Sequence, residues 1–200
     1  AVSVKENNYL GDGKQLGFNL ELDKESLAGT LSYNDPNYDF LGNSIYYSLS
    51  SEKNDVPTRG YENSIISAAV STSFEQYKDI DLTLGLTASY DDLTTLSSAS
   101  TALQKQSGEF EEISANYGIS YDKRDRKFMP TNGSVVAFNQ TIPLYADKGS
   151  IGNTFAASNY FSFSEDIVTA TKFYIATVNS IDDDVRLSKR KSLSTARLRG

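Results

Sequence analysis

Alternation between apolar and polar residues is the dominant pattern along this chain, and it is longest between Ile80 and Asp91. Every second side chain of that stretch is apolar or aromatic, and those between are polar or small. Because successive side chains of a β-strand point to opposite faces, the pattern predicts a strand with one apolar and one polar face. The strand is longer than the roughly five or six residues usual in soluble domains, and it matches the about 9–11 residues that cross a membrane.

Similar alternating segments recur along the whole chain between groups of turn-forming residues. The clearest of them cover residues 16–22, 27–33, 45–49, 66–74, 80–91, 113–121, 134–143, 150–163 and 169–180. Asn153 and Asn159 interrupt the apolar face of the segment 150–163, so the register of that strand stays open. The sequence has no helical periodicity and no linker, and we therefore predict about ten strands joined as up-and-down hairpins in one all-β domain.

The connections between these segments also form a pattern. Short turns are predicted at residues 10–13, 35–43, 75–79 and 164–167, and longer or more polar loops at 51–63, 92–108 and 181–200. Short turns on one side of the membrane and long loops on the other are typical of transmembrane antiparallel β-barrels. The polar faces carry Glu21, Asp81 and Glu112. Each would cost on the order of a few kcal/mol if it faced lipid, so these faces are expected to line the lumen.

The composition agrees with a membrane barrel and removes other classes. Mean hydropathy is -0.42, and no stretch approaches the roughly 18 consecutive apolar residues of a transmembrane helix. Low hydropathy does not argue against a barrel, because alternate residues of its strands face a polar lumen. The 13 Tyr and 10 Phe suit the aromatic girdles of a barrel, although they would equally suit the core of a soluble β-sandwich.

The residue types that are missing limit the chemistry. Without Cys there is neither a disulfide nor a thiolate metal site, and without His there is no Ser-His-Asp triad or imidazole ligand. We therefore expect no enzymatic activity and no cofactor. A net charge of -7 gives no electrostatic footprint for nucleic acid. Asp91-Asp92 and Asp182-Asp183-Asp184 lack the spacing of calcium ligands, so no metal site is expected.

The most specific local sequence runs from Tyr121 to Gly133, where a charged run precedes Pro130-Thr131-Asn132-Gly133. Proline fixes its own φ, and asparagine and glycine tolerate a positive φ, so this sequence predicts a compact turn between two strands. From the residues alone, the charged run is interpreted as the solvated side of that turn.

At this turn the chain resembles the BamA family, the barrel subunits of the machine that assembles outer-membrane proteins in Gram-negative bacteria. The segment resembles the turn after the eighth strand of that barrel. The residues at the motif positions are Asp122, Arg124, Asp125, Pro130, Thr131 and Gly133. Residues 8–13, 32–38 and 198–200 resemble three further family motifs in matching order and spacing.

The resemblance implies that residues 1–200 are the N-terminal half of a transmembrane β-barrel domain, from about the second strand to the sixth surface loop. We expect the chain to be incomplete at both ends, with the POTRA domains of the family outside it. It begins without the features of a signal peptide. In the family an Arg-Gly motif of the sixth loop enters the lumen and its arginine pairs with acidic residues on later strands. Arg199 and Gly200 match that motif.

The rest of the segment 181–200 is strongly basic, through Arg186, Lys189, Arg190, Lys191 and Arg197. Two interpretations stay open for this charge. It could attract lipopolysaccharide phosphates, or it could be plain solvated charge, which is the usual role of a charge run and the one that we favour.

The implied function is that of an assembly factor that folds and inserts β-barrel proteins into the bacterial outer membrane. The implied partners are outer-membrane lipids and lipopolysaccharide, nascent outer-membrane proteins and the lipoproteins of the assembly machine, with no nucleic acid. The alternatives are a secretion or translocation pore of the same superfamily and a passive outer-membrane porin. A soluble β-sandwich is the alternative outside the membrane.

Overall fold

The computed structural model describes residues 1–164, 167–181 and 184–191 of the 200 residues. They form a single ten-stranded antiparallel sheet in which each strand pairs with its neighbours in chain order. The strands are β1 (Val2–Tyr9), β2 (Lys14–Leu22), β3 (Ser26–Asp35), β4 (Ser44–Val56), β5 (Tyr61–Tyr77), β6 (Ile80–Thr95), β7 (Gly108–Asp122), β8 (Gly133–Ala146), β9 (Ser150–Ser164) and β10 (Ile167–Ser180). The predicted all-β fold with about ten up-and-down strands is confirmed.

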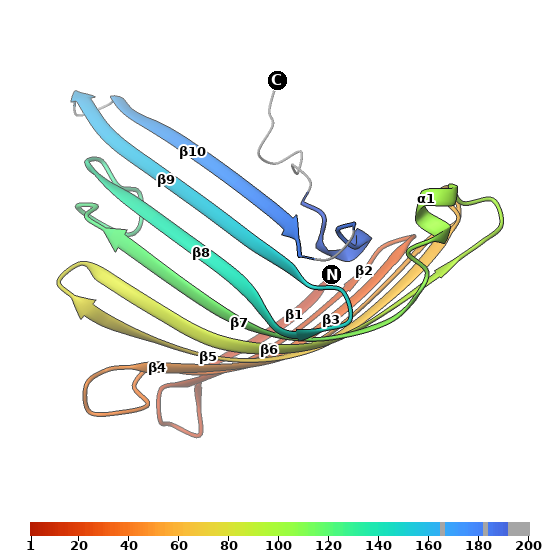
Figure 1. The fold of residues 1–200 in the computed structure, drawn as a ribbon. Coiled ribbons are helices and arrows are strands. Elements are labelled where there is room, and N and C mark those ends of the chain that lie inside the picture. Colours follow the sequence, from red (N-terminus) through yellow and green to blue (C-terminus); the bar gives the residue numbers. More distant parts are fainter. Residues whose placement is uncertain (165–166, 182–183, 192–200) are drawn as a thin grey trace.

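The sheet curves like part of a cylinder wall, and residues 184–191, which come after β10, lie on its concave side (Figure 1). Helix is confined to two short elements among the described residues: α1 (Thr101–Gln104), between β6 and β7, and the 3-10 turn η1 (Leu187–Lys189), after β10. Neither of these helices has the length or apolar character needed to cross a membrane.

The connections gather at the two ends of the strands. We call one the turn end, with connections 10–13, 36–43, 78–79 and 123–132, and the other the loop end, with connections 23–25, 57–60, 96–107 and 147–149. The predicted alternation of short turns and long loops is therefore only partly right. The connection 123–132 at the turn end is longer than three of the four described connections at the loop end.

The prediction of a loop at residues 51–63 is wrong, because most of that segment is strand. Residues 51–56 of β4 pair with residues 61–66 of β5, and the connection shrinks to 57–60. Lys53 and Glu62 form an ion pair across the two strands with a 2.6 Å separation. The hairpin therefore continues beyond the apolar part of the wall, where polar side chains can face water while the backbone ladder continues.

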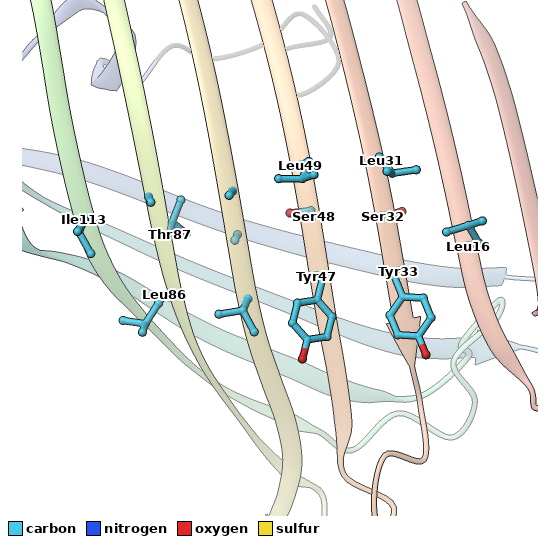
Figure 2. Close-up of a pocket in the computed structure, with 14 residues that line it drawn as sticks. Leu16, Leu31, Ser32, Tyr33, Tyr47, Ser48, Leu49, Leu86, Thr87 and Ile113 are labelled. Carbon is cyan, nitrogen blue, oxygen red and sulfur yellow. The ribbon is translucent and has the colours of Figure 1, made fainter.

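The convex face of the wall is apolar and open to its surroundings. Leu86 of β6 lies beside Val70 of β5 and Ala115 of β7, and Leu86 is 48% exposed. Figure 2 shows part of this face, a shallow hollow across β2 to β7 where Tyr33 and Tyr47 lie side by side with ring centroids 6.2 Å apart. A soluble sandwich would bury such side chains in a core. An apolar face without a second layer fits contact with lipid acyl chains.

The concave face carries small and polar side chains, some of which hydrogen-bond across strands. Asn116 of β7 donates to the Thr87 hydroxyl of β6 at 2.8 Å and accepts from the Thr141 hydroxyl of β8 at 2.8 Å. Close approach favours glycine at two positions, most strictly at Gly85, where the nearby atom belongs to the backbone. A Cβ on Gly118 would lie 2.5 Å from Asn139 Oδ1, and one on Gly85 would lie 2.9 Å from Val70 O. Small concave residues therefore permit the sheet to bend toward this side.

Asn153, which leaves the register of its strand open in the sequence, lies on the convex face. Phe155, two residues along, packs against Phe173 of β10 with ring centroids 6.1 Å apart. The amide of Asn153 accepts from Gln140 of β8 at 2.5 Å and donates to Thr177 of β10 at 3.3 Å. The register keeps the aromatic side chains on the convex face, and hydrogen bonds satisfy the polar residue among them.

The two faces predict opposite responses to charge at adjacent positions. Ala68 of β5 faces the convex side and Ala69 the concave side, since they pair with Leu49 and Ser48 of β4. In lipid vesicles Ala68→Lys is expected to lower the free energy of unfolding by about 2–4 kcal/mol, because a lysine near mid-bilayer must leave water. Ala69→Lys, the matched control, should change it far less. Equal losses in urea-unfolding titrations would contradict the assignment of faces.

Candidate functional site

The most buried side chains lie toward the loop end, and most of them are polar. Within the described part of the chain they are Leu93, Ala99, Phe110, Asn63, Asp91, Gln106, Glu112, Ser114, Ser150 and Arg186. Buried polar groups need hydrogen-bond or charge partners, because leaving water otherwise costs several kcal/mol for an ion. The groups that supply these partners identify the candidate site.

Two carboxylates are brought together by the alternation and pairing of adjacent strands. On β6, Asp91 lies on the same face as Thr87, and on β7, Glu112 lies on the same face as Asn116. Asp91 pairs with Phe110, which is two residues before Glu112 on the same strand. Both acids therefore point to the concave face as diagonal neighbours.

Arg186 holds the two carboxylates from the opposite side. Its Nη2 lies 2.5 Å from Glu112 Oε2, and its Nη1 lies 3.4 Å from Asp91 Oδ2. The side chains of Arg186, Asp91 and Glu112 are 4%, 6% and 1% exposed. A planar guanidinium can reach two acceptors at once, which suits a cation placed between two acids.

We call residues 184–191 the latch segment, and its other side chains extend the same cluster. The Ser188 hydroxyl donates to Asp91, and Lys189 Nζ lies 3.0 Å from Glu112 Oε1. From the wall, the amide of Asn63 on β5, oriented toward its acceptors, donates to Asp91 Oδ1 at 2.7 Å. Two cations thus meet two anions, and each carboxylate has more than one donor.

An aromatic ring completes the surroundings of Arg186. The guanidinium carbon of Arg186 lies 5.3 Å from the centroid of the Phe110 ring, and Lys148 Nζ lies 5.4 Å from the same centroid. A cation over an aromatic face is stabilised electrostatically, more so where water is excluded. Arg186 Nε has no hydrogen-bond partner among the described residues. The cluster therefore holds the arginine through its two terminal nitrogens and its flat face.

The arrangement acts as an anchor for the latch segment on the concave face. Burying separated ions costs several kcal/mol each, and only close opposite charges and hydrogen bonds offset that cost. Such a cluster gives little net stability over an apolar contact of the same size. It does penalise every arrangement in which one of its ions is left without a partner, and so it specifies where the segment sits.

The interpretation of the basic segment as plain solvated charge is wrong for Arg186, which is buried, and for Lys189, which contacts Glu112. Arg190 and Lys191 are exposed, as that interpretation expects. Arg197, and the Arg199 and Gly200 of the predicted Arg-Gly motif, lie outside the described residues, so their role stays a prediction. Among the described residues it is Arg186 that pairs with acidic residues on the concave face, namely Asp91 and Glu112.

The predicted turn motif after β7 forms one compact unit. Arg124 donates two hydrogen bonds to the Asp122 carboxylate, from Nε at 2.8 Å and from Nη2 at 2.6 Å. Asp125 accepts from the Thr131 hydroxyl at 2.6 Å and from the Thr131 backbone nitrogen at 3.0 Å. The structure thus brings Asp122 together with Arg124, and Asp125 together with Thr131.

Pro130 and Gly133 close this turn. Pro130 stands immediately before Thr131, at a point where the chain belongs to neither strand. Gly133 opens β8 with φ +97, and a Cβ there would lie 2.1 Å from Lys123 O, so no other residue fits without moving the backbone. The motif positions therefore have a structural explanation in the shape of the turn.

Sequence reasoning missed the anchor residues Asp91, Glu112 and Arg186 as a group. The alternation gives the face of both acids, since each shares its face with small polar residues. The available signal was a lone charge on an otherwise small and uncharged concave stripe, such as Glu112 beside Ser114 and Asn116. The cation that meets it comes from 74 residues further along the chain, a distance over which no local pattern acts.

Comparisons with known proteins agree with this fold. A family model described as the Omp85 superfamily domain matches residues 8–191. The fold is similar to the crystal structure of BamA from Haemophilus ducreyi lacking POTRA domains 1-3, with a TM-score of 0.75 and 22% sequence identity. The match covers 90% of this chain and 38% of that one, so the chain spans well under half the length of that structure. The predicted resemblance to a BamA-like barrel segment is confirmed.

Removing the cation of the anchor should release the latch segment. Arg186→Ala leaves Asp91 and Glu112 buried without their main partner, and we expect the docked state to lose about 3–5 kcal/mol. Limited proteolysis should then cut the latch segment faster. Lys191→Ala, an exposed neighbour, is the matched control. Neutralising the acids in Arg186→Met/Asp91→Asn/Glu112→Gln should restore resistance, and unchanged cleavage of Arg186→Ala would contradict the anchor.

Acid should loosen the turn after β7. The hydrogen bond from the Thr131 hydroxyl, helped by the backbone nitrogens of Asn132 and Thr131, lowers the pKa of Asp125 from 3.8 to about 2. A lowered pKa in the folded state stabilises the turn above pH 4, and this contribution is lost as the pH falls from about 4 to about 2. Amide exchange at Thr131 and Asn132 should accelerate over that range. Asp125→Asn should weaken the acid dependence at these two amides, and an unchanged dependence would assign it to another group, such as Asp122, which is paired with Arg124.

Proposed function

The chain belongs to the Omp85 superfamily, and we propose that it forms part of the barrel wall of a factor that folds and inserts β-barrel proteins into the bacterial outer membrane. One observation carries the proposal: a wall with an apolar convex face holds a chain segment on its concave face through the buried pair of Arg186 with Glu112 and Asp91. The anchor holds an ordered segment on the concave face, and contact with lipid on the convex face does not require such a segment.

The shape of the wall would determine how a client strand can pair with it. An unfolded β-protein can join a sheet by edge pairing, in which backbone hydrogen bonds supply the affinity and the geometry of the edge determines which segment fits. That edge has a constant geometry only if the wall keeps its curvature. A latch fixed to β6 and β7 and covalently continuous with β10 ties together strands that are otherwise linked only through their neighbours.

The orientation and partners follow from the same proposal. We assign the turn end to the periplasm and the loop end to the cell surface, so that nascent outer-membrane proteins arrive at the turn end. Lipoproteins of the assembly machine would contact the turn end, and lipopolysaccharide would surround the loop end. The buried position of Arg186, and the place of the latch segment on the concave face (Figure 1), remove this segment from the lipopolysaccharide that would surround the convex face.

The test is assembly by the full-length protein in lipid vesicles. An unfolded outer-membrane β-barrel client is added, and its folding is followed by its altered mobility in unheated gels. Vesicles with the protein should fold the client several times faster than empty vesicles or vesicles with a porin. Arg186→Ala should lower that rate, while Lys191→Ala should not.

Two other outcomes would overturn the proposal. Folding at the rate of empty vesicles, combined with transport of a soluble secreted passenger, would assign the chain to a secretion pore of the same superfamily. The same lack of acceleration, combined with passage of small solutes through the protein, would indicate a passive porin.

A further inference from the structure

The turn 123–132 projects two apolar side chains from a basic frame. Phe128 and Met129 are 80% and 70% exposed at its tip. Residues 122–133 contain four cationic and two anionic side chains, a net charge of +2 in a chain whose net charge is -7. Adjacent exposed apolar residues within a cationic frame are uncommon on a surface meant only for water.

The two anions of this turn are already engaged inside it. Asp122 is paired with Arg124, and Asp125 receives the Thr131 hydrogen bonds. Lys123 and Lys127 form no salt bridge among the described residues, and the Nε of Arg126 stands 3.8 Å from Asp125 at 58% exposure. The turn is therefore a fixed structure whose remaining charge, next to the apolar tip, is positive.

The position of the turn determines what this surface meets. Tyr121 ends the apolar residues of β7 on the convex face, and the turn begins two residues later. In a membrane barrel, tyrosine rings at the edge of the apolar face lie at the level of the lipid headgroups. The tip thus emerges where acyl chains give way to phosphates.

We propose that the turn 123–132 binds anionic phospholipid headgroups in the leaflet at the turn end of the wall. Phe128 and Met129 enter the boundary between headgroups and acyl chains, and Lys123, Arg126 and Lys127 lie against the phosphates. An apolar tip gains from leaving water, while the cations gain from the negative surface of the leaflet. The positive charge makes an anionic lipid surface a better occupant than a zwitterionic one.

A second turn at the same end provides an internal comparison. In the turn 36–43, Phe40 and Leu41 are also exposed, and the carboxylate of Asp39 fixes the turn through the backbone nitrogens of Leu41 and Asn43, each at 3.0 Å. This turn contains no Lys or Arg. It has the apolar tip and the ordered backbone without the positive charge, so its contact with lipid should not depend on anionic headgroups.

The experiment places a spin label at the tip of each turn of the full-length protein. Residues 1–200 contain no cysteine, so Phe128→Cys and Phe40→Cys give one attachment site each within this segment. The protein is reconstituted into vesicles of phosphatidylcholine alone or mixed with phosphatidylglycerol. The accessibility of each label to oxygen, which concentrates in lipid, is compared with its accessibility to a water-soluble nickel chelate.

The expected result is a severalfold drop in nickel accessibility at position 128 when phosphatidylglycerol is present, with no such change at position 40. Adding Lys123→Glu and Lys127→Glu should abolish the drop at position 128. The idea is overturned if position 128 stays accessible to nickel in both lipids, if position 40 responds equally, or if the charge reversal has no effect. Protection that needs an added lipoprotein would assign the tip to a protein partner instead.

This proposal requires a wall that spans a membrane, and it does not require the assembly activity. The label reports on lipid contact and the client assay reports on folding, so either proposal can fail without the other. A protein that folds clients while position 128 stays in water would retain its proposed function and lose only the lipid site.

Discussion

The continuous ladder of backbone hydrogen bonds between β1 and β10 is the constraint on which the rest of this molecule depends. In hydrocarbon an unpaired peptide group costs several kcal/mol. Each strand inside the wall must therefore form backbone hydrogen bonds with the strands on both sides. Because the backbone groups are hydrogen-bonded between strands, the two faces of the sheet differ only in their side chains. The alternation of residues then sends apolar groups to the convex face and small polar groups to the concave face.

The ion cluster at the loop end has a different physical character from the wall around it. In the described part of the chain no second layer covers the wall, and many of its large apolar side chains are exposed, so these residues form little conventional core. Burial is concentrated where the latch segment covers Asp91 and Glu112. A polar core of this kind adds specificity more than stability, because its charges tolerate few alternative partners. The latch position is therefore better defined than its small contact area would suggest.

The sequence predicts the parts of this fold that local alternation controls. The strand predicted at residues 80–91 and its two faces follow from a period of two, although the strand continues to Thr95 into the segment predicted as a loop. The turn before Gly133 follows in part from the φ preferences of its residues: Gly133 has the expected positive φ, but the second positive φ lies at Met129 and not at Asn132. The hairpin through Lys53 and Glu62 was misjudged because charge on both faces resembles a loop, although paired strands in water tolerate it. Arg186 could not be matched to its acids, because the approach of the latch segment depends on the curvature of the whole sheet.

The latch also has a mechanical consequence. Arg186 lies only six residues after Ser180, the last residue of β10, yet its partners lie on strands β7 and β6, three and four places away in the sheet. At about 4.8 Å between strands, that path along the wall is about 14–19 Å, and six extended residues can span roughly 20 Å. The ion pairs of Arg186 therefore join the end of β10 to β6 and β7 by a contact that the backbone ladder does not make. A force that flattened the wall would change the distance between β10 and β6, and the buried ion pairs would oppose that change.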